Sequence, residues 1–337
     1  MKILISSHAF APDIGGIETV SGLLAAEFVR LGHVVTVVTQ TPHDQSEDPG
    51  YHILRQPSIP QLFRAIKWCD IFWQNNLSVR TLWPALFARK PLVVTHQGSY
   101  CRRPSGIDLV QRIKHAIVRR TTSVAISRAV AACFETDSAV IPNPYDGRIF
   151  VRLPHEQERP SDLIFIGRLV TEKGIDLLLE ALARLWERNL FPRLTIVGPG
   201  PERSAMEHLA TRLELGDQVT FVGPKRDAEL VRLLQQHKIL VIPSRYDEPF
   251  GVVALEGIAC GCVAVGSAGG GLPEAIGPCG LTFPNGDIGA LALALERLLL
   301  ASEERRRLIA HAPAHLTKFQ PAVIAEAYLS LFRSQLP

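Results

Sequence analysis

The chain has few cysteines, and none of them stand in the short pairs that bind metals. Its 337 residues include six cysteines, and no Cys-x-x-Cys pair occurs among them. This spacing argues against a zinc site or a disulfide framework. Cys260 and Cys262 lie in an apolar stretch, where packing in a core is the simplest interpretation. We therefore expect reduced thiols and a cytoplasmic protein.

Long apolar runs are also absent. Because no stretch of about 18 uninterrupted apolar residues occurs, we expect no membrane-spanning segment. Residues 1–5 carry one charge and a short apolar run that His8 and Pro12 soon interrupt, a pattern unlike that of a signal peptide. Hydrophobic residues make up 47% and charged residues 20% of the chain, which excludes a disordered or collagen-like protein.

Neither sign of charge dominates. The net charge is +3, with 17 basic and 11 acidic residues in 1–154 and 19 basic and 22 acidic residues in 155–337. The mild positive excess in the first part suggests an anionic partner there. A nucleic-acid-binding protein usually shows a stronger basic footprint, so we expect no nucleic-acid partner.

Short β-branched runs alternate with longer helical segments along the chain. This βαβα pattern predicts an α/β protein with doubly wound parallel sheets, whose strands are apolar because helices cover both faces. The predicted strands are 2–6, 34–39, 70–74, 91–95, 122–126, 138–142, 162–167, 193–197, 218–222, 238–242, 262–266 and 280–283. Helices are predicted near 175–188, 202–215, 227–236 and 250–260, and the tail from 287 is expected to be helical with breaks at Pro313 and Pro321.

A polar, proline-containing segment at 151–161 interrupts the series and is typical of a linker. We therefore expect two Rossmann-like domains that face each other across a cleft, covering 1–154 and 155–315. A C-terminal helix over 316–337 is expected to pack back on the first domain. In open α/β sheets, ligands bind beyond the carboxyl ends of the strands, so the site residues are sought there.

Two glycine-rich loops follow predicted strands and precede helices. Gly15 and Gly16 come after the first strand, where free backbone N–H groups and the helix dipole favour a phosphate. Residues 269–271, which include Gly270, form a second arrangement of this kind. A plain glycine-rich turn is the alternative for both, and the first loop matches neither the P-loop nor the Gly-x-Gly-x-x-Gly pattern.

Charged residues also cluster after two predicted strands. Arg168 and Lys173 share one loop, where the guanidinium fork suits a phosphate; two solvated surface charges are the alternative. Glu248 lies in another loop, and Glu256 lies inside the helix that follows it. Carboxylates accept hydrogen bonds from the vicinal hydroxyls of a ribose or hexose, whereas two ordinary helix glutamates are the alternative. An ionised Glu256 in its apolar surroundings would need partners.

Taken together, these motifs resemble the retaining glycosyltransferases of family four, which have the GT-B fold. The resemblance covers nearly the whole chain. The residues that carry it are Gly15-Gly16, Pro142-Asn143, Arg168 with Lys173, Gly198-Pro199-Gly200-Pro201-Glu202, Glu248 with Glu256, and Gly270-Gly271-Leu272-Pro273-Glu274.

The resemblance implies that the second domain binds a nucleotide diphosphate sugar, such as a UDP- or GDP-sugar. The first domain would bind the acceptor, which is a glycan, a glycolipid or a small molecule. Arg168 and Lys173 would contact the donor diphosphate. Glu248 would hold hydroxyls of the transferred sugar, and Glu256 the ribose. The other donor-binding positions implied are Gly15, Gly16, Phe250, Gly251, Val252 and Gly270.

The charge that develops during transfer predicts a metal-independent reaction. The leaving nucleotide diphosphate gains negative charge, and Arg168 and Lys173 would stabilise it in the transition state. No Asp-x-Asp motif is present for a metal, and no cofactor is expected besides the nucleotide sugar. Since no carboxylate stands out as a covalent nucleophile, we expect the acceptor to attack an oxocarbenium-like centre from the leaving-group face, with retention.

His96 is the remaining catalytic candidate. It ends a predicted strand, where a histidine can donate or accept a proton; a structural histidine is the alternative. The family usually has Thr-x-His here, whereas this chain has Thr95-His96-Gln97. Either His96 acts one position early or Gln97 occupies the site, because a shift of one residue turns a side chain to the other face.

Several other functions stay open from the sequence. An NAD-dependent oxidoreductase suits the architecture, but its glycine fingerprint is missing. A two-lobed binding protein would usually be exported, and a sugar-nucleotide epimerase of the same fold would differ in its product. Residues 100–120 carry six basic residues and one acid between apolar positions, which favours peripheral membrane contact; a packed helix with a solvated basic face is the alternative.

Overall fold

The structure is a computed structural model that describes residues 1–13, 15–42, 49–76, 78, 81, 83–85, 90–98, 121–134, 138–153 and 159–336. It divides into two compact units. Unit 1 comprises Met1–Pro144 and Phe319–Pro337, and unit 2 comprises Tyr145–Lys318. The sequence predicted domain boundaries after residues 154 and 315, whereas the chain passes between the two units after residues 144 and 318. The polar composition of a linker does not mark where the packing of one unit ends.

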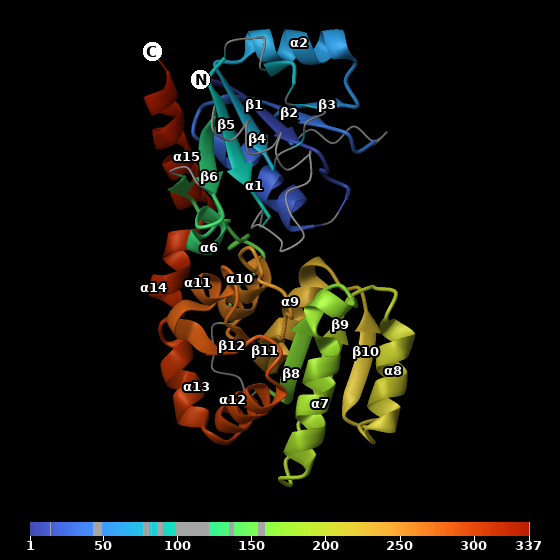
Figure 1. Cartoon of the computed structure of the whole chain (residues 1–337). Helices are drawn as coiled ribbons and strands as arrows, with labels where there is room; N and C mark the ends of the chain where they lie inside the picture. Colours follow the sequence, from blue (N-terminus) through green and yellow to red (C-terminus); the bar gives the residue numbers. More distant parts are fainter. Residues whose placement is uncertain are drawn as a thin grey trace. The chain divides into compact units, whose positions relative to one another are not determined.

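Unit 1 is built on a parallel sheet (Figure 1). Among the described residues the strand order is β3-β2-β1-β4-β5-β6-β7, and each neighbouring pair is parallel. The strands are β1 (Lys2–Ser7), β2 (Val34–Thr39), β3 (His52–Arg55), β4 (Ile71–Asn75), β5 (Leu92–His96), β6 (Thr122–Ala125) and β7 (Ala139–Val140). The described helices are α1 (Gly16–Arg30), α2 (Ile59–Trp68), α6 (Arg128–Ala131) and α15 (Pro321–Gln335). The chain order reverses between β1 and β4, which makes that junction the switch point of the sheet.

The C-terminal helix α15 belongs to the core of unit 1. It lies beside α1 and against the sheet (Figure 1), and its apolar side chains join the core cluster of β1, β2 and β4. The rings of Trp73 and Tyr328 lie 4.8 Å apart, and the Thr95 hydroxyl lies 2.9 Å from the hydroxyl of Tyr328. Trp73 Nε1 also donates to Thr95, so these buried polar atoms are paired inside an apolar layer.

Unit 2 repeats the architecture. Among the described residues its strand order is β10-β9-β8-β11-β12-β13, again parallel throughout. The strands are β8 (Ser161–Ile166), β9 (Leu194–Val197), β10 (Val219–Gly223), β11 (His237–Ile242), β12 (Val263–Ser267) and β13 (Gly280–Phe283). The helices are α7 (Ile175–Trp186), α8 (Arg203–Arg212), α9 (Asp227–Gln236), α10 (Val252–Ala259), α11 (Leu272–Ile276), α12 (Ile288–Leu300), α13 (Ser302–Ile309) and α14 (Ala312–Leu316). Short 3-10 turns are η1 (Thr171–Lys173), η2 (Gly277–Cys279) and η3 (Thr317–Phe319). The switch point lies between β8 and β11.

The strands predicted from the sequence are confirmed, each to within a few residues at its ends. The prediction omitted β3 (His52–Arg55), a strand without a fully buried residue and therefore without the apolar run that marks the others. The two tail prolines were expected as breaks, and both lie in the first turn of a helix, Pro313 in α14 and Pro321 in α15. A proline fits there because the first-turn N–H groups lack helical partners.

Four described cysteines are free, and a fifth forms a disulfide. Cys69, Cys260, Cys262 and Cys279 are free and buried, as expected for core packing, whereas Cys133 is disulfide-bonded, so the expectation of reduced thiols is wrong at that position. No short Cys motif marks Cys133, which is why spacing gave no sign of the bond.

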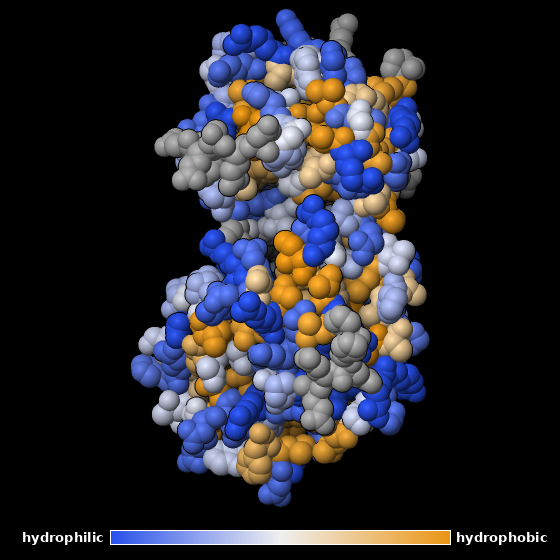
Figure 2. All heavy atoms as spheres, turned by 180° about the vertical axis from the view of Figure 1, so that it is seen from behind, coloured by the Kyte–Doolittle hydropathy of each residue, from blue (hydrophilic) through white to orange (hydrophobic). Residues whose placement is uncertain are grey.

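Within the described ranges, no helix combines the length and apolar character that a bilayer span needs. Apolar patches lie between hydrophilic side chains on the surface (Figure 2).

Candidate active site

The loops at the carboxyl edge of the unit 2 sheet are tied to one another by backbone hydrogen bonds. The loop after β11 joins the loop after β8, because Arg245 N donates to the carbonyl oxygen of Glu172 over 2.9 Å. It also joins the loop after β12, because Gly271 N donates to the carbonyl oxygen of Glu248 over 2.7 Å. These bonds bring the charged residues that flank the β8–β11 switch point into one place.

Two glycines make this close approach possible. Gly270 has φ +70°, and a Cβ there would collide with the backbone of Asp247 and Glu248. Gly251 has φ +103° and precedes α10, and a Cβ there would lie 2.6 Å from Leu272 Cδ1. Both conformations disfavour other residues. Loop packing therefore explains why glycine stands at positions 251 and 270, both of which were predicted to bind the donor.

Glu248 and Lys173 meet at this edge. Lys173 Nζ lies 2.5 Å from Glu248 Oε1, and Glu248 is 6% exposed. Two hydroxyls complete its surroundings. Ser244 Oγ donates to Glu248 Oε1 and Tyr246 Oη donates to Glu248 Oε2, both over 2.6 Å. A buried carboxylate with a cation and two hydroxyl donors is well satisfied, as charge burial requires.

Ser244 and Tyr246 were not expected at the site from the sequence. Both stand in the same strand-end loop as Glu248, and that position was the only signal available. Burial, followed by the charge of Glu248 and the hydrogen bond to it, raises the pKa of the Tyr246 phenol. Tyr246 therefore stays protonated and remains a hydrogen-bond donor to Glu248.

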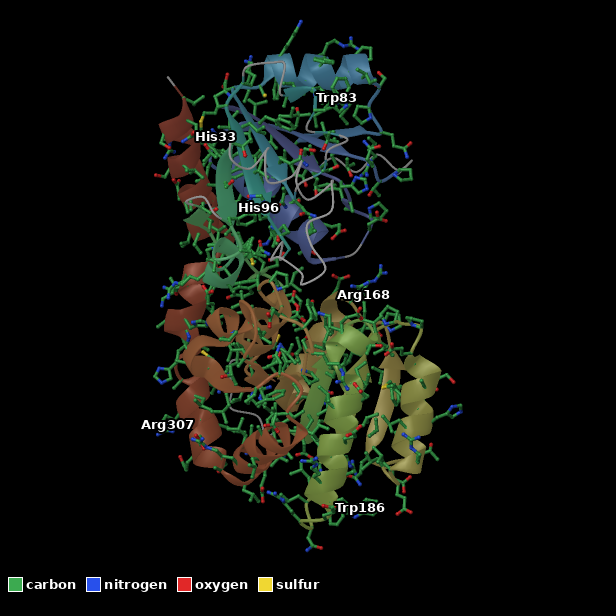
Figure 3. All side chains as sticks on the ribbon, viewed as in Figure 1. His33, Trp83, His96, Arg168, Trp186 and Arg307 are labelled. Atoms are coloured by element: carbon green, nitrogen blue, oxygen red, sulfur yellow. The ribbon has the colours of Figure 1, made fainter. Side chains whose placement is uncertain are left out.

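Arg168 lies at the same edge with its side chain exposed, at the opposite end of unit 2 from Trp186 (Figure 3). It forms no ion pair with a described residue. Its charge lowers the pKa of the Tyr246 phenol, against the stronger effects of burial and Glu248. Arg168 lies in the loop after β8 that also carries Lys173, and no ion pair with a described residue engages its guanidinium.

Glu256 stands apart from this cluster in its chemistry. It lies inside α10, where its carboxyl makes no hydrogen bond or ion pair with a described residue, and desolvation raises its pKa to about 7. Three further positions predicted to bind the donor lie at the start of α10. Phe250 is buried and precedes the helix, Gly251 is its N-cap, and Val252 is its first residue. A carboxyl with a raised pKa and no partner among the described residues is available to accept a hydrogen bond from a ligand hydroxyl.

The raised pKa of Glu256 makes the stability of unit 2 depend on pH. Its folded-state value of about 7 lies above the ordinary 4.5, so its stabilising contribution is complete below pH 4.5 and is lost as the pH rises through about 7. A glutamine at this position cannot ionise, so Glu256→Gln should be more stable than the wild type at pH 8. We expect this gain in the free energy of unfolding to be about 1–2 kcal/mol larger at pH 8 than at pH 5, a value reduced for the partial exposure of the side chain. Urea unfolding at both values measures this, with the exposed Glu187→Gln as control; equal differences at both pH values would contradict it.

In unit 1, Gly15 and Gly16 lie at the start of α1. Gly15 is the N-cap and has no side chain to cap the helix, and a Cβ at Gly16 would meet no described neighbour within 4 Å. Packing against the described residues therefore does not explain Gly16, and none of their side chains caps the first-turn N–H groups by a hydrogen bond. The Glu18 carboxylate folds back toward Gly15, where it complements the helix dipole.

His96 and Gln97 occupy different surroundings at the end of β5. His96 is fully buried, with its ring 4.2 Å from the ring of Phe134. Gln97 lies just beyond the strand, where its amide donates to Asn75 Oδ1 over 2.8 Å and to Asn143 Oδ1 over 3.0 Å. A catalytic role for His96, or for Gln97 in its place, stays a prediction.

Two further sequence predictions concern partners. The basic segment 100–120, proposed for membrane contact, falls outside the described residues. Within the part of the chain that is described, no group of three or more His, Cys, Asp or Glu residues is arranged to hold a metal ion.

Comparison with known proteins gives the family. Residues 151–315 match the family model of the glycosyl transferases group 1. The chain is 32% identical over 368 residues to a glycogen synthase of Mycobacterium tuberculosis, covering 91% of this chain and 89% of that protein. It is 36% identical over 182 residues to the D-inositol 3-phosphate glycosyltransferase of Corynebacterium jeikeium, covering 51% of this chain and 43% of that relative. The chain therefore spans less than half the length of some curated relatives that it matches.

Solved structures give the fold. Anabaena Alr3699/HepE in complex with UDP and glucose matches 99% of this chain with a TM-score of 0.82 at 20% identity. The sucrose-phosphate synthase of Thermosynechococcus elongatus matches 99% with a TM-score of 0.76 at 22% identity. The two parallel-sheet units therefore have the GT-B architecture of glycosyltransferases. Within that class, the chain belongs to the group 1 glycosyltransferases, the family that the sequence motifs resembled.

Proposed function

We propose that the protein is a retaining, metal-independent hexosyltransferase that moves a sugar from a nucleotide diphosphate sugar to an acceptor hydroxyl. One observation carries the proposal: Lys173 pairs with Glu248 at the switch point of the unit 2 sheet, and Arg168 lies in the same strand-end loop as Lys173. Ligands of open α/β sheets bind at such points. The names of similar proteins support the ligand class, because they include a glycogen synthase and a structure in complex with UDP-glucose.

The two cations fit the leaving group. When the bond between the anomeric carbon and the phosphate breaks, the nucleotide diphosphate gains charge, and Arg168 and Lys173 would meet it without rearrangement of solvent. Arg168 presents a planar fork that matches two phosphate oxygens, and Lys173 presents three N–H donors. In this proposal the protein's own cations take the part that a metal plays in other transferases.

The two glutamates fit the sugar and the ribose. Glu248 is held in place by Lys173 and Tyr246, and its carboxylate oxygens suit the hydroxyls of the transferred sugar. Glu256 has a desolvated carboxyl without a partner among the described residues, which suits the vicinal hydroxyls of the ribose. The backbone N–H groups at the start of α10, after Gly251, would add contacts to the donor.

The acceptor is proposed to bind unit 1. Gln97 with Asn75 and Asn143 offers neutral amides at strand ends, which suit a polyhydroxylated acceptor, whether a glycan, a glycolipid or a small molecule. Gly15 and Gly16, at the start of α1, stay proposed as donor-binding positions. Membrane contact through 100–120, and a cytoplasmic location, belong to the same proposal.

The test is release of nucleoside diphosphate from UDP-glucose, GDP-mannose and ADP-glucose, with and without glycan and inositol phosphate acceptors, in buffer containing EDTA. We expect at least one donor to be consumed at a rate that EDTA changes less than twofold, with the anomeric configuration retained in the product. Conversion of the donor into an epimer without release of nucleoside diphosphate would replace the proposal by an epimerase. Activity that EDTA abolishes and magnesium restores would overturn metal independence.

A further inference from the structure

The loop after β11 carries a tyrosine that touches both charged members of the Lys173–Glu248 pair. Tyr246 Oη lies 2.6 Å from Glu248 Oε2 and 3.2 Å from Lys173 Nζ. The ammonium also lies 5.2 Å from the centroid of the Tyr246 ring, within the range of a cation–π contact. Tyr246 is 37% exposed whereas Glu248 is 6% exposed, so the phenol lies between the buried carboxylate and solvent.

The donors around Glu248 are divided unequally between its two oxygens. Lys173 and Ser244 both donate to Oε1, and Tyr246 is the one described residue that donates to Oε2. A carboxylate has about four acceptor positions, two on each oxygen. Oε1 is therefore filled, and Oε2 keeps one acceptor position for a further hydroxyl.

Once a donor is bound, both Glu248 and the donor diphosphate attract the ammonium group of Lys173. A diphosphate next to Arg168 draws the ammonium toward itself, which weakens the bond from Lys173 to Glu248. A neutral phenol is drawn far less, so Tyr246 keeps its bond to Oε2 when the ammonium shifts. The orientation of the carboxylate then depends on Tyr246 and Ser244.

We propose that Tyr246 is a positioning residue of the donor site: its hydroxyl holds the Glu248 carboxylate in the orientation that accepts hydroxyls of the donor sugar. This inference rests on the proposed function. It separates two parts of donor recognition. The sugar is recognised through Glu248 and depends on the Tyr246 hydroxyl, whereas the diphosphate is recognised through Arg168 and Lys173 and does not.

The experiment compares Tyr246→Phe with the wild type by titration calorimetry, with UDP and UDP-glucose, GDP and GDP-mannose, and ADP and ADP-glucose. The variant keeps the ring beside Lys173 and loses only the hydroxyl. For the pair that the wild type binds most tightly, we expect affinity for the nucleotide sugar to fall about tenfold, the effect of losing one hydrogen bond to a charged group. Affinity for the nucleoside diphosphate alone should change less than twofold, and kcat should fall with the sugar affinity.

The matched control is Tyr51→Phe, which removes a hydroxyl in unit 1 from a ring that packs on Phe10. It should leave both affinities unchanged, and thermal unfolding should show that both variants are folded. Equal weakening of the sugar-bearing and sugar-free ligands by Tyr246→Phe, or no weakening of either, would overturn the inference while leaving the proposed function intact. If the wild type binds none of the six ligands, the proposed function fails and the inference fails with it.

Discussion

Arg168→Ala is expected to lower turnover about 10²–10³-fold, the usual cost of removing one preorganised donor from the charge that develops in a transition state. The guanidinium is exposed and forms no ion pair with a described residue, so its removal leaves the packing of unit 2 intact. The melting temperature should therefore stay within about 1 °C, since surface substitutions away from special features usually change stability by less than 0.5 kcal/mol. The measurement is the steady-state rate of nucleoside diphosphate release, with thermal unfolding alongside.

Two variants make the Arg168 result specific. Arg168→Lys keeps the charge but loses the planar fork, so we expect it to recover only part of the activity. Arg307→Ala removes an equally exposed guanidinium from α13, away from the carboxyl edge (Figure 3), and should leave turnover unchanged. A normal rate in Arg168→Ala, or an equal loss in Arg307→Ala, would remove Arg168 from the diphosphate site.

Glu248→Gln is expected to lower kcat/KM about 100-fold, because a charged acceptor for sugar hydroxyls becomes a neutral amide. The amide also fits poorly among its neighbours. Lys173, Ser244 and Tyr246 all donate to the two carboxylate oxygens, and a glutamine must turn its own NH₂ group toward one of these donors. The loss should be larger for the complete nucleotide sugar than for the nucleoside diphosphate.

The control for Glu248→Gln is Glu304→Gln on α13. Glu304 is similarly shielded and is paired with Arg297 and Arg307, so its substitution also breaks ion pairs of unit 2. It should lower stability without changing kcat/KM. Should the two glutamine variants lose activity to the same extent, the effect of Glu248→Gln would be one of stability, and its assignment to the sugar would be wrong.

The sequence predicted most of the fold because two strong local signals agreed. Strands such as β2 and β11 are apolar runs that helices cover on both faces, and the helices between them end at glycines such as Gly32, which has φ +84°. Where the local signal is weak the prediction failed, as for the partly exposed β3. The limit between the units was also displaced, since it depends on long-range packing.

Part of the candidate site was predictable, because functional side chains in parallel α/β sheets often lie just after the carboxyl ends of strands. Arg168, Lys173 and Glu248 were expected after β8 and β11, and the parallel sheet brings these loops together. Ser244 and Tyr246 could not be found in this way, because serine and tyrosine in a loop carry no charge pattern and their contact with Glu248 depends on the loop's conformation. For His96 and Gln97, one residue of register decided their surroundings, and the motif alone did not fix it.

The most direct test of the account is a crystal structure of the protein with a nucleoside diphosphate, chosen as the one that raises the melting temperature most. The account predicts that the diphosphate lies at the carboxyl edge of the unit 2 sheet, with its oxygens within hydrogen-bond distance of Arg168 and Lys173 and its ribose at Glu256. A diphosphate bound elsewhere on the chain, with Lys173 and Glu248 still paired and untouched, would contradict it.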